Sequence, residues 1–264
     1  MTGGRTADVG LSAEAVTVRF GGLVALDGVS IDVPLGRITG LIGPNGAGKT
    51  TFFNVCCGFQ PCAEGTVRLA GADITTTTPA HRARLGLGRT FQQLKVFTSM
   101  TVRENIAFAA ECADIDANPL TQLGLARAGR ATRRRVRTAA ADLVALTGLD
   151  DVADVPAGRI PTGRGRVLEL ARTLARGPQV LLLDEPSSGL DPKESAALGD
   201  LVVRITQERG LGVLLVEHDM DLVLSVCHRI EVLNFGRMLM IGTAEEVWGS
   251  QAVQDAYLGA PQPA

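Results

Sequence analysis

The stretch GPNGAGKT, Gly43–Thr50, decides the fold of this 264-residue chain. It matches the pattern GxxxxGK[ST], follows an apolar run at 38–42 that is typical of a buried strand, and leads into residues 49–57, which can continue as a helix. Glycines let backbone N–H groups turn inward around phosphates, and the helix N-terminus adds the positive end of its dipole. The stretch therefore predicts a phosphate loop that binds ATP or GTP. The alternative is a glycine-rich turn without a ligand.

Two residues of this loop have side chains suited to a nucleotide and its metal ion. Lys49 can bridge the β- and γ-phosphates, and the Thr50 hydroxyl can bind Mg²⁺. The residues that we expect to contact the nucleotide from this loop are Asn45, Gly46, Ala47, Gly48, Lys49, Thr50 and Thr51.

Acidic residues follow a second apolar run, VLLLDEP at 180–186. Ligands in open parallel sheets lie at the carboxyl ends of the strands, so Asp184 is placed to hold Mg²⁺. Glu185 lies one residue later and can orient or deprotonate the water that attacks the γ-phosphate. His218 ends the next predicted strand on the same edge, which favours a γ-phosphate contact. The alternatives are a solvated acid pair and a structural histidine.

The rest of the chain extends this pattern in both directions. Two β-branched runs flank the turn signal Gly21-Gly22 and predict an antiparallel layer, and the last third alternates strands with helices, which predicts a parallel sheet covered on both faces. The predicted strands are 15–20, 29–33, 38–42, 66–69, 180–183, 213–216 and 230–233. The predicted helices are 49–57, 79–84, 101–111, 130–147, 192–209 and one after Asp219, whereas 114–129 has no clear periodicity.

Composition excludes several classes of function. The formal net charge is −2 and aromatic residues make up 4% of the chain, so neither bulk charge nor a stacking platform predicts binding to nucleic acid. The five cysteines form no CxxC pair, which argues against a structural zinc site or a disulfide framework. No window approaches the 18 or more apolar residues of a spanning helix, and residues 1–14 do not resemble a signal peptide. Any membrane link is expected to come through a partner.

The phosphate loop, the Asp-Glu strand, SSGLD at 187–191 and His218, in this order, resemble the ABC ATPase family across nearly the whole chain. The resemblance implies an α/β P-loop NTPase with a RecA-like parallel sheet core, a small antiparallel β-layer and an inserted helical subdomain. It also implies one domain, 1–264. Its predicted parts are a nucleotide-binding core at 10–95 and 170–243, a helical signature subdomain at 96–169 and a C-terminal helical tail at 244–264.

The same resemblance assigns roles to three further residues. Asp191 belongs to the loop that crosses the dimer interface in the family, and Phe20 takes the aromatic position that stacks on adenine. Gln92, in RTFQQ at 89–93, takes the position that touches Mg²⁺ and the attacking water, in preference to Gln93. The alternatives are a core phenylalanine in a strand and an exposed polar loop.

One motif departs from the family pattern. The signature LSGGQ falls on IPTGR, 160–164, where Pro161 replaces the serine and Arg164 the glutamine. In the family this segment meets the ATP of the opposite subunit. Gly163 and the helix dipole remain, and Thr162 can supply a hydroxyl if the loop shifts by one residue. Losing one charge-assisted hydrogen bond costs on the order of 1.5–3 kcal/mol, so we expect an asymmetric pair in which this chain works beside a different ATPase. A homodimer is the alternative.

KVFTSMTVREN at 95–105 and DAYLG at 255–259 resemble the ATPases of branched-chain amino-acid importers. This implies an ATP hydrolase using Mg²⁺, paired with a second ABC ATPase subunit and two integral-membrane permeases, and indirectly with an extracytoplasmic solute-binding protein. The implied place is peripheral, on the cytoplasmic face of the inner membrane, with no nucleic-acid partner. Urea importers and a lipopolysaccharide-exporting ATPase share parts of the pattern and remain alternatives.

Two further classes are weaker alternatives. Non-transport ABC ATPases carry two cassettes or long coiled-coil insertions, and this chain has neither. A regulatory module without turnover would not need Glu185 and His218. The arginine run at 133–135 is compatible with a phosphate or acidic partner, but a solvated helix face is the preferred interpretation.

Overall fold

The computed structural model describes residues 9–117 and 126–258. Its central sheet has six strands in the order β10-β9-β3-β8-β7-β6, all parallel except β10, which pairs antiparallel with β9. The strands are β3 (Ile38–Ile42), β6 (Leu87–Arg89), β7 (Val180–Asp184), β8 (Gly212–Val216), β9 (Arg229–Asn234) and β10 (Arg237–Gly242). The predicted parallel sheet is confirmed. Its three central strands are buried along their whole length, which explains their continuous apolar runs.

A second, four-stranded sheet is wholly antiparallel, in the order β2-β1-β4-β5. Its strands are β1 (Val9–Phe20), β2 (Leu23–Pro34), β4 (Glu64–Leu69) and β5 (Ala72–Asp73). The β1–β2 hairpin turns at Gly21, whose φ of 58° suits glycine. The predicted antiparallel layer is confirmed, although its strands are longer than predicted. The sequence analysis did not predict β5 or β10.

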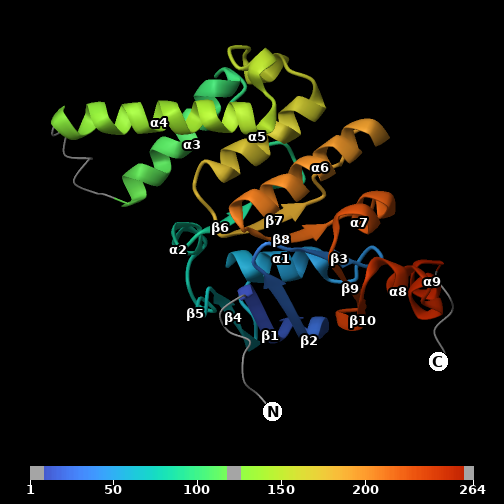
Figure 1. Ribbon diagram of the computed structural model, residues 1–264. Coiled ribbons are helices and arrows are strands. Elements are labelled where there is room, and N and C mark those ends of the chain that lie inside the picture. The colour runs from blue at the N-terminus through green and yellow to red at the C-terminus, as the bar shows by residue number, and fades with distance from the viewer. Residues whose placement is uncertain (1–8, 118–125, 259–264) are drawn as a thin grey trace.

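Helix α1 (Lys49–Cys57) lies between the two sheets (Figure 1). Phe52 and Phe53 of α1 are fully buried in a cluster with residues of both sheets, such as Val18 and Leu182. The phosphate loop at the start of α1 is thereby fixed between two rigid layers.

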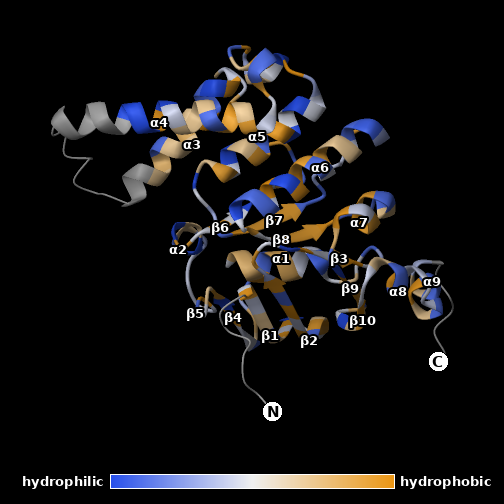
Figure 2. Ribbon diagram, viewed as in Figure 1, coloured by the Kyte–Doolittle hydropathy of each residue, from blue (hydrophilic) through white to orange (hydrophobic). Residues whose placement is uncertain are grey.

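The other helices cover the opposite face of the central sheet or its edges. They are α2 (Pro79–Arg84), α3 (Val102–Ala117), α4 (Ala126–Thr147), α5 (Thr162–Leu174), α6 (Pro192–Arg209), α7 (Met220–Val226), α8 (Ala244–Trp248) and α9 (Gln251–Leu258), with short 3₁₀ turns η2 (Asp150–Val152) and η3 (Ala157–Arg159). Ile106 of α3, Leu143 of α4 and Leu168 of α5 share one core with Leu181 and Leu183 of β7. Figure 2 shows that the helices turn hydrophobic faces inward and polar faces outward.

Two of the predicted helices have bounds that differ from the structure. Helix α4 begins at Ala126, whereas 130 was predicted, and α3 continues to Ala117. Both extensions contain two alanines, the strongest helix former, but no marked apolar period that would have indicated a helix. Residues 118–125 and 259–264 lie outside the described part of the chain, so the predicted tail is described only as α8 and α9. The division into subdomains stays a prediction, and its boundary at 169/170 lies within the unbroken helix α5.

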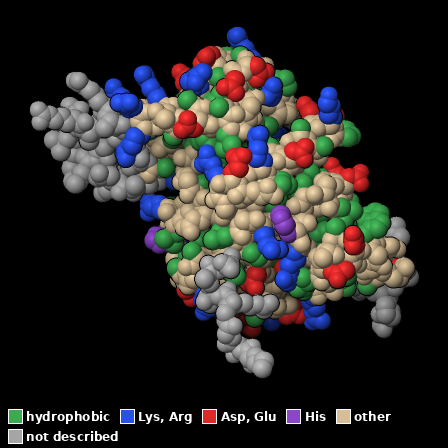
Figure 3. Space-filling view, in the orientation of Figure 1, with side chains coloured by type: hydrophobic (Ala, Val, Ile, Leu, Met, Phe, Trp, Pro, Cys, Tyr) green, Lys and Arg blue, Asp and Glu red, His purple; other side chains and the backbone are tan. Residues whose placement is uncertain are grey.

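Basic side chains are grouped on α4. Arg133, Arg134 and Arg137 are exposed, and Figure 3 shows Lys and Arg side chains on this part of the surface. This is the solvated helix face that one interpretation of the arginine run predicted. Among the described residues, no helix combines the length and the apolar character needed to cross a bilayer.

Candidate nucleotide site

The phosphate loop joins the end of β3 to α1, and its backbone requires glycine at two positions. Gly43 has φ 152° and Gly48 has φ 107°, both in the region that L side chains rarely adopt. A Cβ on Gly43 would lie 2.0 Å from the Leu233 carbonyl oxygen, and one on Gly48 would lie 2.8 Å from that of Ala25. The loop therefore packs backbone against backbone at these two glycines. The Ala47 N–H donates to the Pro44 carbonyl oxygen at 3.1 Å, and the N–H groups of the other loop residues are suited to surround an anion.

Lys49 opens α1 and is buried beneath this loop. Its ammonium nitrogen donates hydrogen bonds to the carbonyl oxygens of Gly43, at 2.6 Å, and Pro44, at 3.0 Å. Burial lowers the pKa of Lys49, while the nearby carboxylates of Glu185 and Asp184 raise it. A cation held by carbonyl dipoles at the base of the loop is suited to phosphate oxygens.

Asp184 ends β7 at the carboxyl edge of the sheet. Its backbone N–H donates to Thr90 Oγ1 at 3.3 Å, and its Oδ2 lies 2.9 Å from a guanidinium nitrogen of Arg89. Arg89 also donates to Asn54 Oδ1 at 2.8 Å. The predicted metal ligand is therefore held from two sides by the end of β6.

Glu185 follows in a conformation unusual for its residue type. Its φ is 47°, the left-handed region, and its backbone N–H donates to the Val216 carbonyl oxygen at 2.9 Å. Gln92 Nε2 donates to Glu185 Oε2 at 2.7 Å, and His218 Nε2 lies 2.9 Å from Glu185 Oε1. Strained residues of this kind are concentrated at functional sites. The three residues predicted as catalytic are thus in direct contact.

A cavity of about 580 Å³ faces the phosphate loop, within the range of small-molecule sites. Its lining includes Phe20, the loop residues 45–51, Glu185, His218 and also Phe235, which the sequence analysis did not single out. The side chain of Phe20 is 49% exposed, so it is not a core residue. Asp184, Gln92, Thr162, Gly163 and Asp191 do not line this cavity.

The signature segment lies at the start of α5, where Pro161 is the N-cap and Thr162 the first helical residue. Thr162 is exposed. Arg164 turns back toward the linker from α4, donating to the Gly148 carbonyl oxygen at 2.6 Å and to Asp151 Oδ2 at 2.9 Å. This part of the chain therefore presents no glutamine-like amide beside Gly163.

Asp191 has a structural contact as well as its predicted role. It caps α6, because its Oδ1 accepts the Glu194 backbone N–H at 2.8 Å, and Glu194 Oε2 accepts that of Asp191 at 3.3 Å. The Glu194 carboxylate lies against Gly163, 2.6 Å from where a Cβ would stand. An acidic side chain therefore already occupies the neighbourhood of the signature glycine.

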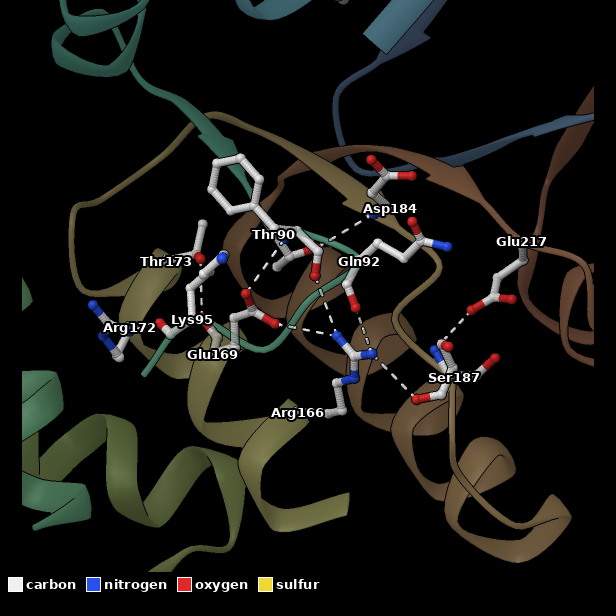
Figure 4. Close-up of polar contacts among 12 residues, drawn as sticks. Thr90, Gln92, Lys95, Arg166, Glu169, Arg172, Thr173, Asp184, Ser187 and Glu217 are labelled. Carbon is white, nitrogen blue, oxygen red and sulfur yellow. Dashed lines mark hydrogen bonds and ion pairs between the residues drawn. The ribbon is translucent and has the colours of Figure 1, made fainter. Parts of the chain in front are cut away.

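Several charged residues around the site were not predicted from the sequence. Arg166 and Glu169 of α5 are buried beside the Gln92 loop, and Glu217 is buried with Oε1 accepting the Ser187 N–H at 2.7 Å (Figure 4). Arg89 binds Asp184. Arg166 and Glu169 lie three residues apart among the apolar positions of a helix, and charges at inward positions were the signal that could have identified them.

The chemistry of the side chains fits a nucleotide with Mg²⁺. Thr50, Asp184 and Gln92 offer hydroxyl, carboxylate and amide oxygens, which are the ligands that Mg²⁺ prefers alongside phosphates. Lys49 and the helix N-terminus supply the positive potential.

The fold and the site together define a P-loop nucleotide-binding cassette. The family model described as "ABC transporter" matches residues 26–188. The chain belongs to the ABC transporter family, and its class is that of the nucleotide-binding ATPase subunits.

Similar proteins are alike in length as well as sequence. The branched-chain amino acid transport ATP-binding protein BraF of Pseudomonas aeruginosa is 40% identical over 250 residues, which cover 94% of this chain and 97% of the relative. LivG of Escherichia coli K12, named in the same way, is 36% identical over 249 residues, with the same coverage. The ADP conformation of the ATP-binding cassette MJ1267 superposes with a TM-score of 0.81 at 30% identity, covering 96% of this chain and 99% of that one.

Proposed function

We propose that this chain binds ATP with Mg²⁺, hydrolyses it, and powers the import of branched-chain or related amino acids. The observation that carries ATP hydrolysis is the position of Glu185, which lines the same cavity as Lys49 and the phosphate loop. The solute class is supported by the names of BraF and LivG, which match this chain along nearly their whole length.

The substrate is bound at two ends of the cavity. Lys49 and the loop N–H groups hold the phosphates, with Asn45, Thr50 and Thr51 beside them, and Phe20 stacks on the adenine. Thr50, Gln92 and Asp184 hold the metal ion. When bound, Mg²⁺ neutralises the negative charge of the phosphate oxygens.

Glu185 orients the attacking water and accepts its proton. Its carboxylate is steadied by His218 on one oxygen and by Gln92 on the other. In the reaction His218 would turn to the γ-phosphate and Gln92, with Thr50 and Asp184, would hold the metal ion, which would free both carboxylate oxygens of Glu185 for water. The resting contacts therefore hold the base in place before the substrate is complete.

A second ATPase subunit completes the site. Thr162, Gly163 and Asp191 lie outside the cavity of their own chain, as expected of residues that face the nucleotide of a partner. Pro161 offers no hydroxyl, Arg164 is engaged by Asp151, and the Glu194 carboxylate adds like charge toward a phosphate. We infer that this chain lends a weak signature and works in a heterodimer, with its own phosphate loop forming the more active site.

The heterodimer is tested by inactivating one site at a time. In the purified mixed pair, Glu185→Gln in this chain is expected to remove most ATP hydrolysis, and the matching change in the partner to have a mild effect. The reverse result contradicts the asymmetry. Stable, fully active assemblies of this chain alone would favour the homodimer.

Permeases are proposed to dock in a groove of about 370 Å³ between α2, β6, α3 and α5. Its lining includes the exposed rings of Phe59, Phe91 and Phe108, and cationic side chains such as Lys95 and Arg172. This composition fits an amphipathic segment with an acidic residue. Docking there places the chain peripherally on the cytoplasmic face of the inner membrane.

Transport is tested by reconstitution of the chain with its partner ATPase, permeases and solute-binding protein in proteoliposomes. ATP-driven uptake of labelled leucine is expected, and Lys49→Ala is expected to abolish it. ATP hydrolysis without uptake of leucine, isoleucine or valine would refute the solute class, and uptake of urea would establish that alternative. Lys95→Glu should also weaken permease co-purification, whereas Arg68→Glu on β4 should not.

A further inference from the structure

Arg166 is a buried arginine whose hydrogen bonds reach two loops of the site. It is 8% exposed, and its guanidinium points from α5 toward the Gln92 loop (Figure 4). It donates to the carbonyl oxygens of Phe91 at 3.2 Å, Gln92 at 2.7 Å and Ser188 at 3.2 Å. One side chain thus joins the signature helix to the loop after β6 and to the loop after Glu185.

Glu169, one turn further along α5, also contacts the Gln92 loop. Its Oε2 lies 3.5 Å from Arg166 Nη1, and its Oε1 accepts the Phe91 backbone N–H at 3.4 Å. Both side chains are nearly fully buried. Both backbone polar groups of Phe91, its N–H and its carbonyl oxygen, are therefore bound by this pair.

A buried ion pair is seldom the most stable way to fill its space, because an apolar pair of similar volume is often as good or better. Here the pair also leaves Arg166 Nε buried without a hydrogen bond among the described residues. All the hydrogen bonds that the Arg166 side chain makes to backbone carbonyl groups go to the loops of Gln92 and Glu185, and none goes to its own helix. These features favour a role in the site over a role in stability alone.

The contacts form a continuous path. Arg166 binds the Gln92 backbone, the Gln92 side chain binds Glu185 Oε2, and Glu185 faces the phosphate loop. Arg166 itself does not line the nucleotide cavity. Any effect of Arg166 on hydrolysis must therefore pass through the loops that it holds.

We propose that Arg166 is a positioning residue that locks Gln92 and the Ser188 loop to α5, so that movement of the signature helix sets the position of Gln92 relative to Glu185 and the metal-binding residues. This inference rests on the proposed ATP hydrolysis. It adds a connection within one chain between the signature helix and the catalytic base.

A double-mutant cycle tests the path. Arg166→Met is expected to lower kcat about 10- to 100-fold, the range of a small misplacement of catalytic groups, with KM for ATP changed less than about twofold. In a Gln92→Ala variant, adding Arg166→Met should lower kcat by less than about a further twofold. If the double variant loses kcat by the product of the two single losses, or if Arg166→Met changes only KM, the proposal is overturned. Arg103→Gln, at an exposed pair with Asp154, is the matched control and should leave kcat unchanged.

Hydrogen exchange provides a second readout if Arg166→Met does not fold. Arg166→Lys keeps the charge but cannot reach three carbonyl groups at once. We expect amide exchange at 90–93 and 187–190 to accelerate together, while exchange in α1 is unchanged. Unchanged exchange in either loop would overturn the proposal. If the assembled wild-type ATPase pair hydrolyses no ATP, the proposed function fails, and this exchange experiment still tests the role of Arg166.

Discussion

Arg89 and Asp184 form an ion pair of 2.9 Å in which each side chain is only 11% exposed. The guanidinium is also within 6 Å of the ring centres of Phe53, Phe59 and Phe91. Arg89 lines the proposed docking groove, whereas Asp184 is the predicted metal ligand. One side chain therefore spans the distance from the groove to the metal-binding edge of the sheet.

Breaking this pair should destabilise the protein without nucleotide or Mg²⁺. Arg89→Met leaves the Asp184 carboxylate buried and unpaired, which costs about 3–5 kcal/mol. Adding Asp184→Asn should recover part of the loss, because no charge is then left alone. Urea unfolding measures both. Arg237→Met, at the more exposed pair with Asp27, should cost at most about 1 kcal/mol. Equal losses of unfolding free energy from Arg89→Met and Arg237→Met would contradict the burial of the Arg89–Asp184 pair.

The phosphate loop should tolerate alanine at Gly46 better than at Gly48. Both have positive φ, so each change carries about 1 kcal/mol or more of backbone strain. A Cβ on Gly46 meets open space, but one on Gly48 meets the Ala25 carbonyl oxygen. Gly48→Ala should therefore lose about 1–3 kcal/mol more in thermal unfolding without nucleotide. If the two variants unfold alike, the described loop packing is wrong.

Phe20 and Phe235 are both exposed aromatic residues of the nucleotide cavity, at 49% and 68%. If Phe20 stacks on adenine, Phe20→Ala should weaken ATP binding about 5- to 30-fold, since stacking on a base contributes about 1–2 kcal/mol. Phe20→Trp should bind normally. Calorimetric titration separates the two residues. A large loss with Phe235→Ala and none with Phe20→Ala would transfer the role to Phe235.

Glu231 of β9 should make stability depend on pH. The pKa of this fully buried carboxyl is raised from 4.5 to about 7, chiefly by burial, with Arg229 lowering it and Asp32 raising it. The folded state then binds the proton more tightly, so the contribution of Glu231 to stability is fully present below pH 4.5 and is lost as the pH rises to about 7. The loss is about 3 kcal/mol, at about 1.4 kcal/mol per pH unit.

Glu231→Gln should remove this pH dependence and be the more stable form at pH 8. Unfolding free energies at pH 5, 6.5 and 8 measure the effect. Glu111→Gln, at an exposed position of α3, should leave the profile of the wild type unchanged. A Glu231→Gln profile that falls as steeply as that of the wild type would exclude this carboxyl as the cause.

The sequence predicted helix bounds where local residues determine them. The bounds of α1 and α6 match the prediction, because a glycine loop begins one and Asp191-Pro192 begins the other. Strand β10 was missed because it is an edge strand whose residues alternate between exposed and half-buried, with no continuous apolar run. The predicted roles of the site residues stay predictions, although the structure brings Gln92, His218 and Glu185 into contact.

Contacts between distant segments could not be predicted. Arg166 lies 74 positions from Gln92 along the chain, and Arg89 lies 95 from Asp184. No local pattern specifies which loops a buried arginine will bind, because tertiary packing decides it. Charged residues at inward-facing positions of a helix were visible in the sequence, but their partners were not.

The account depends on Glu185 activating water beside a nucleotide held by Lys49. Phosphate release from Mg²⁺-ATP by the assembled ATPase pair, with Glu185→Gln compared to wild type at saturating ATP, tests this most directly. We predict a loss of at least about 100-fold with ATP binding retained, the scale of a lost general base. Hydrolysis by the Glu185→Gln pair at the wild-type rate would contradict the account.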